Sequence, residues 1–202
     1  MASLEQNALI SVADKTGIEA FAKGLVELDW KIYSSGGTAD RIDAAGIPVR
    51  DVKELVGGAA ILNHKVVTLS REIHGGILAD ESAEDTSDLE REGIPRIGLV
   101  CVDMYDLEQE LANPDATPES VRLKTDVGGP TMLHSAAKGR RIVLSNASQR
   151  QPVLEWLKAG QPNKEQYIIE LAAAAELAAA EHIMASARFL GNLASKTDNH
   201  RV

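Results

Sequence analysis

The chain has 202 residues, 44% of them hydrophobic and 25% charged, which suits one large globular domain. Its net charge of −9 argues against nucleic-acid binding through a basic surface, but it leaves room for a local positive pocket that holds one phosphate. No apolar run reaches membrane-spanning length and the first residues lack a signal-peptide pattern, so we expect a cytoplasmic protein without membrane contact.

Short apolar runs alternate with amphipathic segments along most of the chain. β-branched and apolar residues predict strands at 8–14, 30–35, 65–70, 97–105 and 140–146, with a short extended piece at 48–52. Helical spacing predicts helices at 15–28, 36–46, 126–139 and 148–160, a charged helix or loop at 81–93, and one or two alanine-rich helices within 164–193. The single cysteine, Cys101, lies in the most apolar run and is expected to be a small buried hydrophobe.

This alternation predicts an α/β fold with a mostly parallel sheet flanked by helices. We expect one domain over residues 1–202, with a sheet core at 1–152 and a C-terminal helical extension at 153–202. In open α/β sheets, ligands bind at the carboxyl ends of the strands. The loops that follow each predicted strand are therefore the first places to look for function.

The loops after the first two predicted strands are rich in hydroxyl groups and glycine. "SVADKTG" (11–17) offers the hydroxyls of Ser11 and Thr16 and the ammonium of Lys15, and "SSGGT" (34–38) places two glycines at the start of a helix. Both loops could bind a phosphate through helix amide groups. The alternatives are a helix N-cap beside a surface lysine and a tight strand-to-helix turn. Two such loops on one sheet edge favour the phosphate interpretation.

Two further loops carry candidate catalytic groups. Tyr105 follows the most apolar strand, where it could donate to an oxyanion or simply pack in the core. In "TDVGGPTMLHSAAKG", Asp126 comes before a helix and Lys138 lies near its end. The two could form an acid–base pair at one substrate group. Alternatively, Asp126 is a turn residue and Lys138 interacts with the helix dipole.

Taken together and in this order, the motifs resemble the IMP cyclohydrolase domain of the bifunctional purine-biosynthesis enzyme that also carries AICAR transformylase. The matching motifs are "SVADKTG", "SSGGTA", "AAGIPVRDVKELVGG", "TL" with "HGGIL", "DMY", "DVGGPTMLHSAAK" and "LAAAAELAAAEHIMASARFLG". The resemblance covers nearly the whole chain, which would then be a cyclohydrolase domain without a transformylase domain, with the methylglyoxal-synthase-like fold of that family.

The resemblance implies a ring closure. The carboxamide nitrogen of 5-formamidoimidazole-4-carboxamide ribotide attacks the formyl carbon, water leaves, and IMP forms. No metal and no redox cofactor are implied, so positioning and oxyanion stabilisation would carry the catalysis. The partner implied is a purine ribotide, and a homodimer or a separate AICAR transformylase chain is left open.

The resemblance also assigns individual positions. Asp126 and Lys138 match the family's acid–base pair, and Tyr105 matches a tyrosine near the reacting oxyanion. The candidates for binding the substrate and its phosphate are Ser11, Lys15, Thr16, Ser34, Gly36, Gly37, Thr38, Thr68 and Gly128.

The stretch "NHKVVTLSREIHGG" (63–76) departs from the family pattern, which reads approximately R-V-K-T-L-H-P before the histidine–glycine run. Val67 takes the place of the family's lysine, Ser70 of its histidine and Arg71 of its proline. That lysine is thought to assist the oxyanion, and losing one such donor typically costs ~10²–10³ in rate. The candidate replacement cations are Lys65, Arg71 and His64.

Two other departures change the charge near the site. "DMYD" adds the carboxylates of Asp103 and Asp106 near an anionic substrate. His134 replaces a family arginine; it is expected to be an exposed helix residue, although a histidine could titrate into a new role.

Three functions are compatible with these observations. The first is an active, divergent IMP cyclohydrolase. The second is a purine-ribotide-binding module that has lost or changed its chemistry, which the loss of the family lysine at Val67 motivates. The third is methylglyoxal synthase chemistry; it ranks low because the chain lacks the G-G-D-x-Q pattern of those enzymes.

Overall fold

A computed structural model describes residues 6–62, 66–105 and 107–198 of the chain. Its centre is a five-stranded, all-parallel sheet in the order β3-β2-β1-β4-β5. The strands are β1 (Asn7–Val12), β2 (Lys31–Ser34), β3 (Arg50–Asp51), β4 (Leu99–Asp103) and β5 (Ile142–Leu144). The predicted α/β class with a parallel sheet is confirmed.

Helices flank this sheet; α7 packs most extensively against α9 and also contacts α3, α5 packs against α6, and α1 packs against α8. The helices are α1 (Ile18–Val26), α2 (Gly36–Ala44), α3 (Arg71–Leu78), α4 (Ala83–Glu92), α5 (Leu107–Ala112), α6 (Pro118–Lys124), α7 (Gly128–Lys138), α8 (Arg150–Lys158) and α9 (Lys164–Asp198), with short 3-10 turns at Val52–Glu54 and Ala147–Gln149. Gly24 of α1 lets α8 approach, because a Cβ there would collide with the Leu154 side chain.

The central strands are apolar because helices cover the sheet. Leu9, Ile10, Leu99 and Val100 are completely buried. Cys101 lies among them, and burial raises the pKa of its thiol to about 12. It is therefore protonated and packs as a hydrophobe, which confirms the expectation from sequence.

The strand predicted at 65–70 is wrong over the part of it that the structure describes. Val66 makes only an isolated bridge with Ile61, and the chain then bends into α3. Ser70 begins that helix as its N-cap, since its Oγ accepts a hydrogen bond from the Ile73 amide. The described part of this β-branched run is therefore not a strand of the sheet and is followed directly by the capped helix α3.

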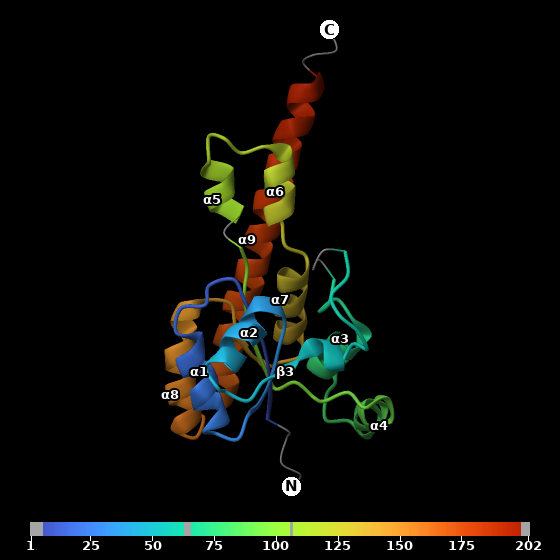
Figure 1. Ribbon diagram of the computed structural model, residues 1–202, viewed down its shortest axis with the longest axis vertical. Coiled ribbons are helices and arrows are strands. Elements are labelled where there is room, and N and C mark those ends of the chain that lie inside the picture. The colour runs from blue at the N-terminus through green and yellow to red at the C-terminus, as the bar shows by residue number, and fades with distance from the viewer. Residues whose placement is uncertain (1–5, 63–65, 106, 199–202) are drawn as a thin grey trace.

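The helix α9 is one continuous element of 35 residues, roughly 50 Å long at the usual rise per residue. It packs against α7 and β5, and its C-terminal part extends beyond the sheet, where α9 also contacts α5 (Figure 1). Among the described residues, no helix is both long enough and apolar enough to cross a membrane.

Candidate active site

The carboxyl ends of β1 and β4 lie side by side at the middle of the sheet, where Val12 pairs with Asp103. β2 and β3 lie on one side of β1, and β4 and β5 lie on the other. The direction of the connections reverses at this point, which is where parallel α/β sheets form a ligand crevice. The loops chosen from the sequence therefore meet at one edge.

The loops after β1 and β2 form an anion cradle. Gly37, in the first turn of α2, faces Lys15: a Cβ on Gly37 would lie 3.8 Å from the Lys15 Cε. Ser35 is the N-cap of α2 but makes no side-chain cap, so the first amide groups of the helix stay open to an anion. Gly36 has a φ of 51°, a conformation that glycine adopts without strain. A helix N-terminus and an ammonium group thus converge.

The hydroxyls of Ser34 and Thr38 are used inside the protein. Ser34 Oγ donates to the Ile10 carbonyl at 2.7 Å, and Thr38 Oγ1 donates to the Val12 carbonyl at 3.1 Å. Both side chains are buried. These hydrogen bonds attach β2 and α2 to β1 and so shape the cradle. Ser11 lies closer to the cradle, with its Oγ 3.3 Å from the Oγ of Ser35, the N-cap residue of α2.

Asp103 and Arg150 bind the backbone of the loop that follows β1, at residues 13–16. Asp103 Oδ1 accepts hydrogen bonds from the amides of Ala13 (2.6 Å) and Asp14 (2.8 Å). Arg150 donates to Asp103 Oδ2 (2.6 Å), to the Asp14 carbonyl (2.7 Å) and to the Thr16 carbonyl (2.6 Å). Burial raises the pKa of Asp103, while these donors oppose the rise. Asp103 was expected to add a negative charge near an anionic substrate, but its carboxylate instead positions the loop that carries Lys15. The other added carboxylate, Asp106, lies outside the described residues.

Asp126 caps the N-terminus of α7. Its two carboxylate oxygens accept the amides of Gly128 and Gly129, each at 3.1 Å. Thr68, which is buried, lies beside it: a Cβ on Gly128 would be 3.0 Å from Thr68 Oγ1. A Cβ on Gly129 would collide with Asp126 and with Met104. The two glycines therefore let a carboxylate, a hydroxyl and the end of β4 come together.

His182 of α9 fixes Asp126 from the other side. Its Nε2 accepts a hydrogen bond from the Asp126 amide at 2.9 Å, so the ring proton of a neutral His182 resides on Nδ1. Burial lowers the pKa of His182, although the Asp126 carboxylate opposes the shift. The imidazole is therefore neutral at physiological pH and serves as an acceptor.

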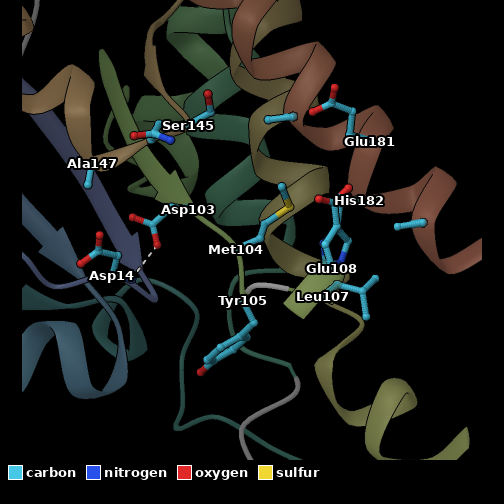
Figure 2. Close-up of a pocket in the computed structure, with 13 residues that line it drawn as sticks. Asp14, Asp103, Met104, Tyr105, Leu107, Glu108, Ser145, Ala147, Glu181 and His182 are labelled. Carbon is cyan, nitrogen blue, oxygen red and sulfur yellow. Dashed lines mark hydrogen bonds between the residues drawn. The ribbon is translucent and has the colours of Figure 1, made fainter. Parts of the chain in front are cut away.

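A cavity of about 390 Å³ lies over the ends of β4 and β5, bounded by α9. Figure 2 shows Met104 and Tyr105 following Asp103, between Asp14 on one side and His182 on the other. Tyr105 is 57% exposed, and the Lys124 ammonium lies 5.3 Å from the centre of its ring. Its phenol group is accessible to a ligand in the cavity.

Lys138 does not meet Asp126 within the chain. α7 runs unbroken between them, which separates the two backbones by roughly 15 Å. The exposed Lys138 instead lines a groove near the beginnings of β4 and β5. The acid–base pair suggested by the resemblance is therefore not assembled in this chain by itself, and the role of Lys138 stays a prediction.

Arg71 is the one candidate replacement cation that the structure describes. Its guanidinium pairs with Glu92 of α4 at 2.7 Å and with Glu72 at 3.6 Å. These contacts hold it on the α3–α4 side of the molecule. His64 and Lys65 lie outside the described residues. Val67, at the position of the family lysine, is partly buried and packs against the core.

His134 is an exposed helix residue, as expected, with its Nδ1 2.9 Å from Glu176 of α9. Within the described ranges, no group of three or more histidine, cysteine or carboxylate side chains has the arrangement of a metal site.

Sequence reasoning did not identify Arg150 or His182. Arg150 follows a strand-end loop in an ordinary helical segment, and nothing in the sequence marks it. His182 had one signal, a polar residue inside an alanine-rich helix that was assigned to packing alone. Both residues come from segments far from the loops they fasten, so only the tertiary structure reveals them.

Comparisons with known proteins agree with this architecture. The family model described as "MGS-like domain" matches residues 17–131. The chain is 41% identical over 156 residues to the bifunctional purine biosynthesis protein PurH of Staphylococcus carnosus, and 43% identical over 156 residues to that of Macrococcus caseolyticus. Each match covers 76% of this chain and 32% of the relative, so the chain spans about a third of the length of these relatives.

A solved structure described as the crystal structure of ForH superposes with a TM-score of 0.81 and 34% sequence identity. The match covers 92% of this chain and 97% of ForH. The resemblance inferred from the motifs is confirmed at this level: the chain is similar to PurH over most of its length and to ForH over nearly all of both chains.

Proposed function

This chain belongs to the MGS-like domain family, and we propose that it is an IMP cyclohydrolase that closes the purine ring of 5-formamidoimidazole-4-carboxamide ribotide. The observation that supports this most is the convergence of two features at one sheet edge. One is the anion cradle of Lys15 and α2, and the other is Asp126, which has Thr68 beside it and lies near Met104 of the cavity that Tyr105 also lines. The similarity to purine biosynthesis proteins suggests the substrate class.

In the proposed reaction, the ribotide phosphate sits at the N-terminus of α2 beside Lys15. The carboxamide nitrogen forms a bond to the formyl carbon, and the Asp126 carboxylate accepts the proton that this nitrogen releases. The formyl oxygen becomes an oxyanion that accepts from the hydroxyls of Tyr105 and Thr68. The proton taken up by Asp126 returns to this oxygen, and the formamido nitrogen gives up its own proton as the ring double bond forms, so the oxygen leaves as water. No group outside the chain is needed to balance these steps.

Asp126 is suited to such a role because two amides and His182 fix its orientation. A carboxylate held in one geometry reaches a bound amide proton without reorganisation. Within one chain, Lys138 is too distant to share a substrate group with Asp126, so the proposal rests on Asp126, Tyr105 and Thr68.

One alternative has a specific observation in its favour. Val67 packs against the core and Arg71 is engaged by Glu92, so neither supplies a cation at the oxyanion. A module that binds a purine ribotide without closing its ring would keep the cradle and lose this donor.

Incubation of the protein with the formamido ribotide separates the two functions. An active cyclohydrolase forms IMP faster than buffer does, as measured by chromatography, and substituting Lys15→Ala raises KM. A folded protein that binds IMP in calorimetry but gives no turnover would support the binding module instead. Failure to bind any purine ribotide would exclude both functions.

A further inference from the structure

A second, larger groove lies at the opposite edge of the sheet. It has a volume of about 780 Å³, and it is bordered by Gly98 and Ile142, where β4 and β5 begin. Trp30 and Ile168 contribute an apolar floor, and Trp30 packs directly over Gly98. A strand of five residues separates this groove from the candidate active site by roughly 16 Å.

The groove is positive although the chain is acidic. Five cationic side chains line it, against two carboxylates, whereas the chain as a whole carries a net charge of −9. Lys138, Arg140 and Lys164 are exposed at its rim, and no hydrogen bond or ion pair engages their side chains among the described residues. They come from the end of α7, the turn after it and the start of α9.

Arg96 and Arg141 give the groove a fixed cationic wall. Both guanidiniums donate to the Ala79 carbonyl just after α3, and Arg141 Nε also donates to the Ile77 carbonyl at 2.6 Å. Burial, and then the neighbouring Arg96, hold the pKa of Arg141 below its usual range. Two like charges are thus held side by side, and a bound anion would relieve their repulsion.

Arg140 lies in the turn that ends α7. Arg140 has a φ of 55°, a left-handed conformation for which glycine or asparagine is the usual residue after a helix. An arginine at this position is strained by comparison. Its side chain lines the groove together with Lys164 of the first turn of α9.

We propose that this groove is a second binding site, for a nucleotide that carries more than one phosphate. The rim cations Lys138, Arg140 and Lys164 would contact the phosphates, and the floor of Trp30, Ile142 and Ile168 would contact the nucleoside. The volume suits a ligand of this size. The site does not depend on the proposed ring closure, because it uses the opposite edge of the sheet.

Calorimetry with ATP in magnesium-free buffer tests this proposal. The wild-type protein should bind ATP saturably, adenosine undetectably, and inorganic triphosphate more weakly than ATP. The double variant Arg140→Glu/Lys164→Glu should weaken ATP binding by about tenfold or more. The matched control Lys23→Glu/Lys53→Glu makes the same change in net charge on exposed lysines away from the groove and should bind as wild type does.

Binding of ATP at the candidate active site is tested separately. Lys15→Ala weakens the anion cradle there and should leave ATP binding at the groove intact. Loss of ATP binding in Lys15→Ala, equal binding by the double variant and its control, or no saturable binding by wild type would each overturn the proposal. Inorganic triphosphate binding as tightly as ATP would overturn the nucleoside contact. If the double variant does not fold, Lys164→Gln alone carries the comparison.

Discussion

Asp103 at the end of β4 and Arg150 at the start of α8 form a buried ion pair, with Arg150 Nη2 2.6 Å from Asp103 Oδ2. Both residues also hold the backbone of the β1 loop, which carries Lys15. A pair that is 47 residues apart in sequence therefore sets the position of the anion cradle. Both terminal nitrogens of Arg150 and both carboxylate oxygens of Asp103 have partners, although Arg150 Nε has none, so removing either residue leaves several buried groups unpaired.

Arg150→Met should therefore destabilise the fold by about 3–5 kcal/mol, because it leaves the Asp103 carboxylate buried without its cation. Urea unfolding measures the change. Arg91→Met is the matched control: Arg91 pairs with Asp88 on the surface, and its loss should cost about 0–1 kcal/mol. An equal effect of the two substitutions would contradict the structural role of the Asp103–Arg150 pair.

Stability should fall as the pH drops below neutral. Burial lowers the pKa of His182 in the folded chain, so the unfolded chain takes up protons first, beginning near its ordinary pKa of about 6.5. The contribution of His182 is fully present above that pH and is lost as the pH falls through its folded pKa, with a slope of at most about 1.4 kcal/mol per pH unit. Unfolding in urea between pH 7.5 and 5 measures it.

His74 contributes in the same direction, since burial also lowers its pKa. His182→Gln should flatten the pH dependence without abolishing it, because a glutamine can still accept from the Asp126 amide but does not titrate. An unchanged slope in this variant would mean that other groups carry the acid sensitivity.

Asp126→Asn should separate stability from chemistry. An asparagine keeps one oxygen to accept from one of the two glycine amides, but its NH2 group cannot accept from the other, so the free energy of unfolding should fall by about 1–2 kcal/mol. If Asp126 is the base for ring closure, the rate should fall by about 10²–10⁴. IMP formation and urea unfolding measured on the same preparation test this. A full rate in a stable Asp126→Asn protein would remove Asp126 from the proposed mechanism.

Val67→Lys restores the family lysine beside Thr68. If the site lacks an oxyanion cation, the variant should raise kcat by about 10²-fold or more while KM changes little. Some loss of stability is expected because Val67 packs against the core. Val67→Met, which is of similar length without the charge, is the control. Equal kcat in the two variants would show that length, or another cation, determines the rate.

The sheet was predictable from local sequence because four of its five strands are apolar runs bounded by polar loops. The run at 65–70 has the same composition, yet its described part turns into α3, where Ser70 provides a cap. Gly76 lies within this helix, and only glycine fits there, because a Cβ on it would lie 2.5 Å from the Pro95 carbonyl oxygen.

The site was predictable in part for the same reason. Parallel strands end at one edge, so loop chemistry read along the chain identified the cradle of Lys15 and Gly37 without knowledge of packing. Asp126 and Lys138 lie at opposite ends of the continuous helix α7, a distance that motif spacing does not reveal, and their pairing at a substrate stays a prediction. Ser34 and Thr38 lie where they were expected, but the structure directs their hydroxyls to the backbone.

The sequence by itself determined the class of fold, the order of its main elements and the family resemblance, because periodicity and strand-end motifs are local properties. The tertiary structure alone decided which polar groups meet. Arg150 and His182 reach the site from helices that follow the sheet core, and Lys138 is carried to the opposite edge by α7. Such contacts depend on how segments distant in sequence pack together, and local sequence patterns do not specify that packing.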